Sequence, residues 1–147
     1  CNVAPEDFLL KIIGTGPMFS SLKNQSYENI EFLGSLPNQE VINLISNAKG
    51  VVTATKLLEG QPTLLCEASS LGIPSIFPRT GGLTEFFPKN YKFSYKQFDY
   101  SDLEQKLKLL MLSDDSYLEG NESKTFINKL LDDKLLISKF EEILNDI

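Results

Sequence analysis

Two glutamates in the stretch E-G-Q-P-T-L-L-C-E-A-S-S-L-G, residues 59–72, have the types and spacing best suited to chemistry. Glu59 stands just before a proline that favours a helix start, and Glu67 lies more than a turn inside the same helix. Carboxylates accept hydrogen bonds from ligand hydroxyls, and the free amides at a helix N-terminus bind anions. The stretch therefore predicts an anion site with a hydroxyl-binding acid on either side.

The helix start explains why an anion fits there. Pro62 suits the first helical position, where its missing N–H is no loss, and Gln61 is expected near the cap. The amides of residues 63–65 then point out of the helix end, where the dipole adds about half a positive charge. Gly60 keeps the approach open. These features indicate a diphosphate site that works without a metal.

The helical period places Glu67 at the edge of an apolar face. Leu64, Ala68 and Leu71 share one stripe, and Glu67 falls about 60° from Leu64, so we expect its carboxylate to be half-buried. Two simpler interpretations remain open: Glu59 merely favours the helix dipole, and Glu67 is an ordinary solvated helix glutamate.

Composition limits the class of protein. The chain has 147 residues, 41% of them hydrophobic, a net charge of −6 and no histidine. We therefore expect one domain with a real core, no nucleic-acid partner, and neither a histidine-based catalytic triad nor a zinc site. No apolar run is long enough to span a membrane, and residues 1–20 lack the basic start and apolar stretch expected of a signal peptide. Cys66 is expected in the core of a protein from a reducing compartment, and Cys1 in place of Met indicates a fragment or a processed chain.

Strand and helix patterns alternate along the chain. Strands are predicted at Phe8–Gly14, Ile30–Gly34, Gly50–Ala54, Pro74–Phe77 and, weakly, Tyr91–Ser94. Helices are predicted at Pro17–Leu22, Gln39–Ala48, Pro62–Leu71, Gly82–Phe87, Ser101–Leu112, Ser123–Leu131 and Lys134–Ile147, with a loop at Ser113–Glu122. This pattern predicts an α/β fold, a Rossmann-like parallel sheet flanked by helices, in a single domain 1–147 whose residues 100–147 form a mostly helical tail.

The segment Gly14-Thr15-Gly16-Pro17 follows the first predicted strand. Ligands of such sheets bind at the carboxyl ends of the strands, and glycines there allow a ligand to approach the backbone. The alternative, a plain strand-to-helix turn with Pro17 at the first helical position, is equally favoured by this feature alone.

The whole pattern resembles the donor-binding, C-terminal domain of family 4 retaining glycosyltransferases, which have the GT-B fold. The motifs that carry the resemblance are T-K-L-L-E-G-Q-P-T-L-L-C-E-A-S-S-L-G-I-P-S-I-F-P-R-T-G-G-L-T-E, L-K-I-I-G-T-G-P and N-I-E-F-L-G-S-L-P, and they cover about residues 8–115. Such domains normally begin with a strand carrying an arginine, followed by a lysine, both contacting the diphosphate. This chain starts too late to contain them, so we expect the first strand-helix unit to be missing.

The resemblance implies a role for each matching residue. Glu59 holds hydroxyls of the transferred sugar and faces its reacting carbon as the catalytic residue, while Glu67 grips the ribose hydroxyls. Residues 63–65 hold the diphosphate, residues 60–62 approach the sugar, and residues 33–35 read the edge of the base. The donor-binding set is Gly14, Gly16, Leu33, Gly34, Ser35, Gly60, Gln61, Pro62, Thr63, Leu64, Leu65 and Glu67. Lys56 and Arg79, near strand ends, are less favoured sources of added positive charge, and the Gly81-Gly82 loop is either part of the cleft rim or a simple turn.

The resemblance thus implies a fragment of a hexosyltransferase that binds a nucleotide-diphosphate sugar, a UDP- or GDP-sugar, without a metal or other cofactor. The full-length enzyme transfers the sugar to an acceptor hydroxyl with retention of configuration, and the fragment alone is expected to be inactive. Its partner is an N-terminal acceptor domain of the same protein. The enzyme is expected to act in polysaccharide biosynthesis in the cytoplasm, with peripheral association at the inner face of the membrane left open. The alternatives are a non-catalytic nucleotide-sugar binding or interaction module and, less favoured, a GT-B-type epimerase.

Overall fold

The structure is a computed structural model that describes residues 8–25 and 27–145; Cys1 lies outside them. The chain forms two compact units, Cys1–Leu44 (unit 1) and Ile45–Ile147 (unit 2), and each is described by itself. Both units contain parallel strands that alternate with helices, so the predicted α/β class is confirmed.

Unit 1 is built on two parallel strands. It contains β1 (Leu10–Ile13), α1 (Phe19–Lys23) and β2 (Ile30–Gly34), and α2 (Asn38–Ser46) begins in it. Leu10 lies opposite Ile30, and after an irregularity in register Ile13 lies opposite Gly34. The carboxyl ends of the two strands therefore meet at the same edge.

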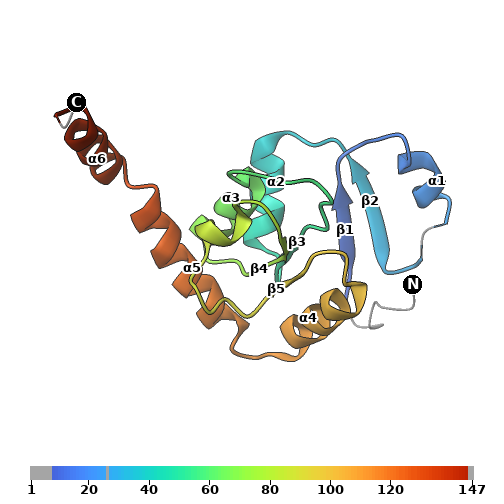
Figure 1. The fold of residues 1–147 in the computed structure, drawn as a ribbon. Coiled ribbons are helices and arrows are strands. Elements are labelled where there is room, and N and C mark those ends of the chain that lie inside the picture. The colour runs from blue at the N-terminus through green and yellow to red at the C-terminus, as the bar shows by residue number, and fades with distance from the viewer. Residues whose placement is uncertain (1–7, 26, 146–147) are drawn as a thin grey trace. The chain divides into compact units, whose positions relative to one another are not determined.

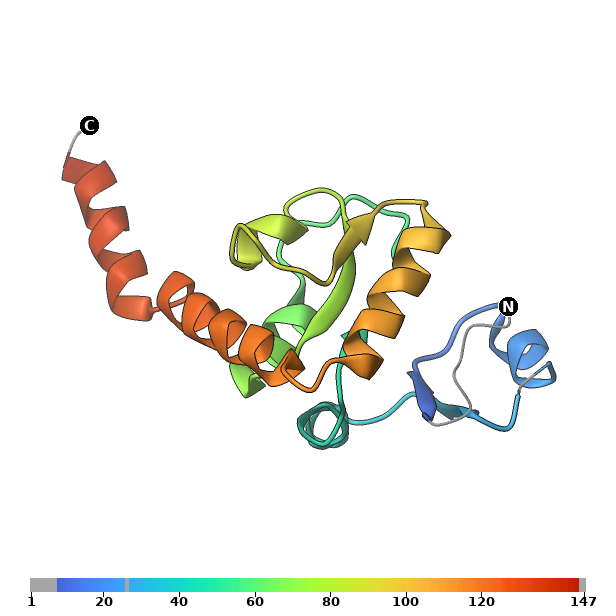
Figure 2. The same cartoon turned by 90° about the horizontal axis from the view of Figure 1, so that it is seen from below.

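Unit 2 has a three-stranded parallel sheet in the order β3-β4-β5 (Figure 1). Its elements are β3 (Val51–Val52), α3 (Thr63–Leu71), β4 (Ser75–Arg79), the 3-10 helix η1 (Leu83–Phe86), β5 (Ser94–Lys96), α4 (Tyr100–Leu112), α5 (Ser116–Leu130) and α6 (Asp133–Asn145). Helices α3 and α4 lie on opposite sides of this sheet (Figures 1 and 2). In place of the expected single sheet, the described residues form two parallel sheets, β1-β2 and β3-β4-β5.

The core of unit 2 forms around the central strand β4, whose first four residues are all buried. Phe77 of β4 stacks with Phe87 and Tyr91, at ring-centroid distances of 4.3 Å and 5.6 Å. Leu65 of α3 and Leu110 of α4 belong to the same buried cluster, so the core fixes both helices against the sheet. Cys66, on α3, is buried with a free thiol, as the sequence predicted.

The predicted loop at Ser113–Glu122 is wrong, because α5 begins at Ser116. The buried face of this helix includes small residues, Ser116, Gly120 and Ser123, which allow a close approach to α3. A Cβ added at Gly120 would overlap the carbonyl oxygen of Gly72 at the end of α3. A polar segment containing glycine is typical of a loop, and only this packing between helices makes it helical.

Three other boundaries differ from the sequence prediction. The fifth strand is Ser94–Lys96 rather than Tyr91–Ser94, and the helix predicted at Gly82–Phe87 is the four-residue 3-10 helix η1. The strand predicted at Gly50–Ala54 is only two residues long. Phe93 is buried in the core just before β5. The apolar pattern at Tyr91–Ser94 therefore belongs mainly to the segment that precedes β5, not to the strand itself.

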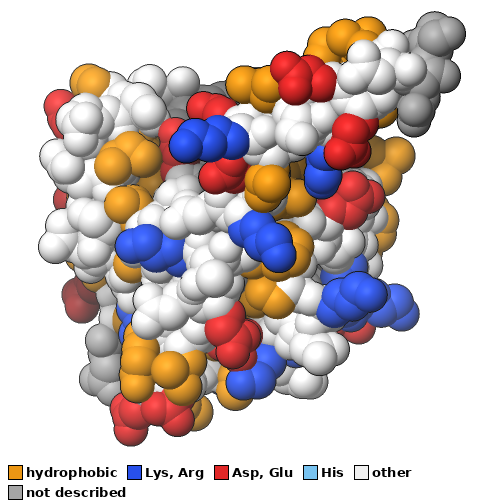
Figure 3. Space-filling view, turned by 90° about the vertical axis from the view of Figure 1, so that its left-hand side faces the viewer, with side chains coloured by type: hydrophobic (Ala, Val, Ile, Leu, Met, Phe, Trp, Pro, Cys, Tyr) orange, Lys and Arg blue, Asp and Glu red, His pale blue; other side chains and the backbone are white. Residues whose placement is uncertain are grey.

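The last helix, α6, is amphipathic and has no buried residue. It extends from the end of α5 away from the sheet of unit 2, and hydrophobic side chains lie exposed on it among charged ones (Figures 2 and 3). Residues 146–147 of the predicted helix lie outside the described residues. In the described part of the chain, no helix has the length and apolar character needed to cross a membrane.

Candidate functional site

The N-terminus of α3 leaves amide groups open to a ligand. Pro62 is the cap residue, with φ −87° and ψ 93°, rather than the first helical residue as predicted, and it makes no side-chain capping bond. The first hydrogen bond of the helix runs from the Cys66 amide to the Pro62 carbonyl oxygen at 2.9 Å. The amides of residues 63–65 precede this bond, and no acceptor within the described ranges satisfies them.

This helix end is exposed but firmly anchored. Gly60, Gln61, Thr63 and Leu64 are exposed, whereas Pro62 and Leu65 are buried. Leu65 is only 1% exposed and belongs to the core of unit 2. Free amides on a fixed, open helix end are the geometry that binds phosphate groups.

Both carboxylates predicted to flank this end are half-buried. Glu59 lies on the loop between β3 and α3, and Glu67 lies in the second turn of α3. This agrees with the half-buried position expected for Glu67. Burial and the neighbouring Glu67 carboxylate raise the pKa of the Cys66 thiol, so this cysteine stays protonated and is not a candidate nucleophile.

The main chain of Glu59 is held by the turn that follows β4. The amide of Gly82 donates a hydrogen bond to the Glu59 carbonyl oxygen at 2.8 Å. Because β3 and β4 are parallel, the loops at their carboxyl ends lie together, and this bond links them. Sequence reasoning left open whether the Gly81-Gly82 loop had any role, since no local pattern identifies a contact with residue 59.

In unit 1 the structure brings Gly14 and Gly34 together. The Gly14 amide donates to the Gly34 carbonyl oxygen at 2.7 Å, and both residues have positive φ, +121° and +73°. Among the residues that the structure describes, no atom lies within 4 Å of a Cβ built on Gly14, Gly16 or Gly34, apart from the glycine itself and its chain neighbours. Leu33 is half-buried and Ser35 is exposed. The cleft expected to join these residues to those of unit 2 stays a prediction.

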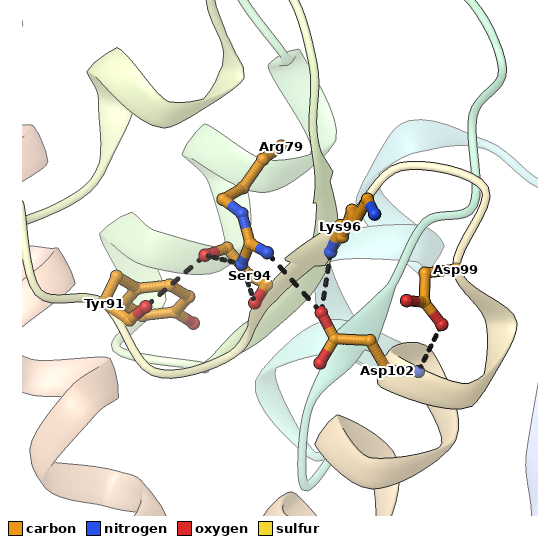
Figure 4. A network of polar contacts seen from close by, with 6 residues as sticks. All are labelled: Arg79, Tyr91, Ser94, Lys96, Asp99 and Asp102. Carbon is orange, nitrogen blue, oxygen red and sulfur yellow. Dashed lines mark hydrogen bonds and ion pairs between the residues drawn. The ribbon is translucent and has the colours of Figure 1, made fainter.

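The guanidinium of Arg79 is engaged by its neighbours at the end of β4 (Figure 4). Its Nη1 donates to the Ser94 carbonyl oxygen at 2.9 Å, and its Nη2 lies 3.5 Å from Asp102 Oδ2. The same carboxylate oxygen accepts a hydrogen bond from the Lys96 amide at 2.8 Å. Arg79 therefore joins β4 to β5 and α4. The carboxylate of Asp102 offsets the positive charge of Arg79, which was a less favoured candidate for the site.

Within the described ranges, no three His, Cys, Asp or Glu side chains are grouped so that they could hold a metal ion. The groups that the described part of unit 2 offers at this helix end are backbone amides, which can bind anions, and two glutamates, which can accept hydrogen bonds from hydroxyls.

Comparison with known families decides the classification. Residues 4–129 match the family model of glycosyl transferases group 1. The chain belongs to this family. The comparison with curated proteins finds no match.

Solved structures of two other proteins share the fold. HepE from Anabaena, solved in complex with UDP, superposes with a TM-score of 0.78 at 13% sequence identity, over 98% of this chain and 42% of that protein. HepE in complex with UDP-glucose gives a TM-score of 0.78 at 15% identity, with the same coverage. Sucrose-phosphate synthase from Thermosynechococcus elongatus gives 0.74 at 16% identity, over 93% of this chain and 38% of that protein. The chain thus spans about two fifths of the length of these proteins, and the likeness confirms the predicted fold.

Proposed function

We propose that this chain is the nucleotide-sugar binding part of a retaining glycosyltransferase of the group 1 family. The observation that carries the proposal is the open N-terminus of α3, with free amides at residues 63–65 between two half-buried glutamates. UDP and UDP-glucose, which are bound in the solved HepE complexes, have the diphosphate and hydroxyl groups that such a site would recognise.

Each part of the site has one task in this proposal. The amides of residues 63–65 hold the diphosphate, which leaves as the nucleotide when the sugar is transferred, and the helix dipole stabilises the charge that develops there. Glu67 accepts hydrogen bonds from the ribose hydroxyls. Glu59 accepts hydrogen bonds from hydroxyls of the sugar and lies beside its reacting carbon. In unit 1, the backbone at Gly14, Gly34 and their neighbours is the part that would contact the nucleotide base.

In the full-length enzyme the acceptor hydroxyl attacks the anomeric carbon, the bond from that carbon to the diphosphate breaks, and the acceptor's proton is released. We propose that configuration is retained and that no bound metal takes part, since backbone amides supply the positive potential. Binding of UDP in the presence of EDTA should then equal binding without it. Because the chain spans only part of its structural relatives, we expect it to bind donor without transferring sugar.

Titration with UDP and GDP tests the proposal most directly. Glu67→Ala should weaken binding of the preferred nucleotide by about 10- to 100-fold, because hydrogen bonds to a charged group contribute about 1.5–3 kcal/mol. Glu122→Ala is the matched control: it removes an exposed glutamate on α5 and should leave the affinity unchanged. Calorimetry measures both.

Two results would count against this function. If neither nucleotide binds, or if Glu67→Ala binds the nucleotide as tightly as the unmodified chain does, the assignment of the helix end fails. Tight binding by a full-length protein that transfers no sugar from a panel of nucleotide sugars would favour the non-catalytic binding module.

We further propose that the apolar face of α6 packs on the N-terminal acceptor domain of the full-length protein. Support comes from the exposure of Leu136, Phe140, Ile143 and Leu144, at 46%, 62%, 60% and 55%, on a helix with no buried residue. An uncovered apolar face of this size is typical of an interface.

Phe140→Asp therefore should lower the melting temperature of the full-length protein but not of this chain. Ser138→Asp, on the same exposed helix, is the control and should change neither. A full-length protein that melts normally with Phe140→Asp would exclude this packing.

A further inference from the structure

We propose that the turn at residues 80–82 is a positioning element for Glu59, and that Gly81 is the residue that sets where the Glu59 main chain lies. The inference rests on the proposed function, because Glu59 is the side chain to which that function assigns the sugar hydroxyls.

The turn contacts the Glu59 peptide from two directions. The Gly82 amide donates to the Glu59 carbonyl oxygen at 2.8 Å. Gly81 has φ +52°, and a Cβ built on it would overlap that same carbonyl oxygen and lie 2.9 Å from the Glu59 amide nitrogen. Only a glycine leaves room for this approach, and only a glycine adopts such a φ without strain.

This requirement is specific to Gly81 among the glycines near the helix end. Within the described part of the chain, a Cβ on Gly60 would meet no atom within 4 Å, and one on Gly82 would come nearest to the Gly60 carbonyl oxygen, at 3.6 Å, which is ordinary contact. Gly60 and Gly82 thus have space for a side chain, whereas Gly81 has a backbone packed directly against it.

The turn is the rigid partner and the Glu59 loop is the one that gives way. Thr80 is 7% exposed and its carbonyl oxygen accepts a hydrogen bond at 3.2 Å from the amide of Leu83, a residue with no exposed surface. In contrast, Leu57 and Leu58, just before Glu59, are 71% and 83% exposed. A side chain at Gly81 would therefore displace the Glu59 peptide rather than the turn.

The displacement is large enough to matter. Restoring ordinary contact to the Glu59 nitrogen, from 2.9 Å to 3.4 Å, requires a shift of at least 0.5 Å. Hydrogen bonds weaken steeply with such misplacement, and catalytic groups require positions fixed within about 0.5 Å. Gly81→Ala should therefore impair recognition of the sugar while leaving recognition of the nucleotide intact.

The test compares two ligands that differ only by the sugar. Calorimetry gives the affinities of the chain for UDP and for UDP-glucose, with GDP and GDP-mannose as a second pair. Within the pair that binds more tightly, the affinity for the nucleotide sugar divided by the affinity for the nucleotide measures recognition of the sugar. We expect Gly81→Ala to lower this ratio about tenfold with less than about a twofold change in nucleotide affinity. In a Glu59→Gln background, Gly81→Ala should have no further effect, because both changes act on one group.

Gly72→Ala is the matched control. Gly72 also has a positive φ, +78°, but a Cβ there would meet only side-chain atoms, Asn121 Oδ1 at 3.3 Å and Lys124 Cδ at 3.7 Å. Gly72→Ala would introduce the same kind of backbone strain at the far end of α3. This variant should lower stability without changing the ratio of sugar-nucleotide to nucleotide affinity.

A second measurement does not depend on the folding of Gly81→Ala. In the unmodified chain, the NMR signal of the Gly82 amide should shift on addition of UDP-glucose and not of UDP, and Glu59→Gln should abolish this shift. Two results would overturn the positioning role alone. One is a Gly82 amide signal that does not change when UDP-glucose is added. The other is a ratio of sugar-nucleotide to nucleotide affinity that Glu59→Gln lowers but Gly81→Ala does not. Absence of any nucleotide binding would instead defeat the proposed function.

Discussion

The phenol of Tyr91 forms hydrogen bonds with both backbone groups of Ser75, the first residue of the central strand in unit 2. The Ser75 amide donates to Tyr91 Oη at 2.6 Å, and the Tyr91 hydroxyl donates to the Ser75 carbonyl oxygen at 2.9 Å. Strand β5 pairs with β4 only from Phe77 onward, so at Ser75 the phenol takes the place of a neighbouring strand. Ser75 has no exposed surface and Tyr91 is 8% exposed, so water cannot easily replace the phenol.

Tyr91→Phe should therefore destabilise unit 2 strongly. The change removes the hydroxyl with little loss of volume and leaves a buried amide and a buried carbonyl unpaired, at about 1–3 kcal/mol for each group. We expect a loss of about 2–4 kcal/mol, a large share of the roughly 5–15 kcal/mol that stabilises a typical domain. With a urea m-value of about 1–3 kcal/mol/M, the midpoint should fall by roughly 1–2 M.

Urea denaturation followed by far-UV circular dichroism measures this loss, and Tyr95→Phe is the matched control. Tyr95 is 2% exposed in the same core, but its hydroxyl lies 3.4 Å from its only recorded acceptor in the described residues, the Thr53 carbonyl oxygen. Such a long bond contributes little, so we expect Tyr95→Phe to cost less than about 1 kcal/mol. Equal losses for the two variants, or a loss below about 0.5 kcal/mol for Tyr91→Phe, would refute the reasoning.

Two further predictions follow from the same packing. Burial raises the pKa of Tyr91, so the unfolded chain releases the phenol proton near pH 10, before the folded chain does. The free energy of unfolding should therefore keep its full value below about pH 10 and fall above it by up to about 1.4 kcal/mol per pH unit. Denaturation measured at several pH values should show a smaller fall per pH unit in Tyr91→Phe. Gly120→Ala should lower stability by about 1–2 kcal/mol despite the better helix propensity of alanine, because its Cβ would overlap the Gly72 carbonyl oxygen. Thermal melting checks this, and Asn128→Ala, an exposed position on α5, should be neutral or slightly stabilising.

The parts of the fold that follow from local chemistry were predictable from the sequence. The helical period and the proline predicted α3 to within one residue, and the same period placed Glu67 at the edge of its apolar face, where the structure has it half-buried. Short apolar segments ending near glycine likewise located β1 and β2.

The parts that failed depend on contacts between distant residues. The start of α5 was missed because Gly120 weakens the helical pattern, whereas the close approach to Gly72 that a glycine allows is a contact between helices that the sequence does not show. The segment at Tyr91 resembles a strand by its alternation, yet its phenol bonds to β4 through the side chain rather than through a backbone ladder. The contact of Gly81 with Glu59 was also invisible, since nothing local requires residues so far apart to touch.

The source of affinity at the helix end can be argued from the charges around it. The chain has a net charge of −6, so its overall field repels a diphosphate. Arg79 at the end of β4 is already paired with Asp102, and the two glutamates beside the helix add negative charge. In the proposed function, attraction therefore acts at short range, through amides that are fixed by the burial of Leu65 and need no reorganisation when the anion arrives. The proposed function then makes binding depend on the exact placement of each main-chain group, so we expect the glycine packed on the Glu59 peptide to matter more than another nearby cation would.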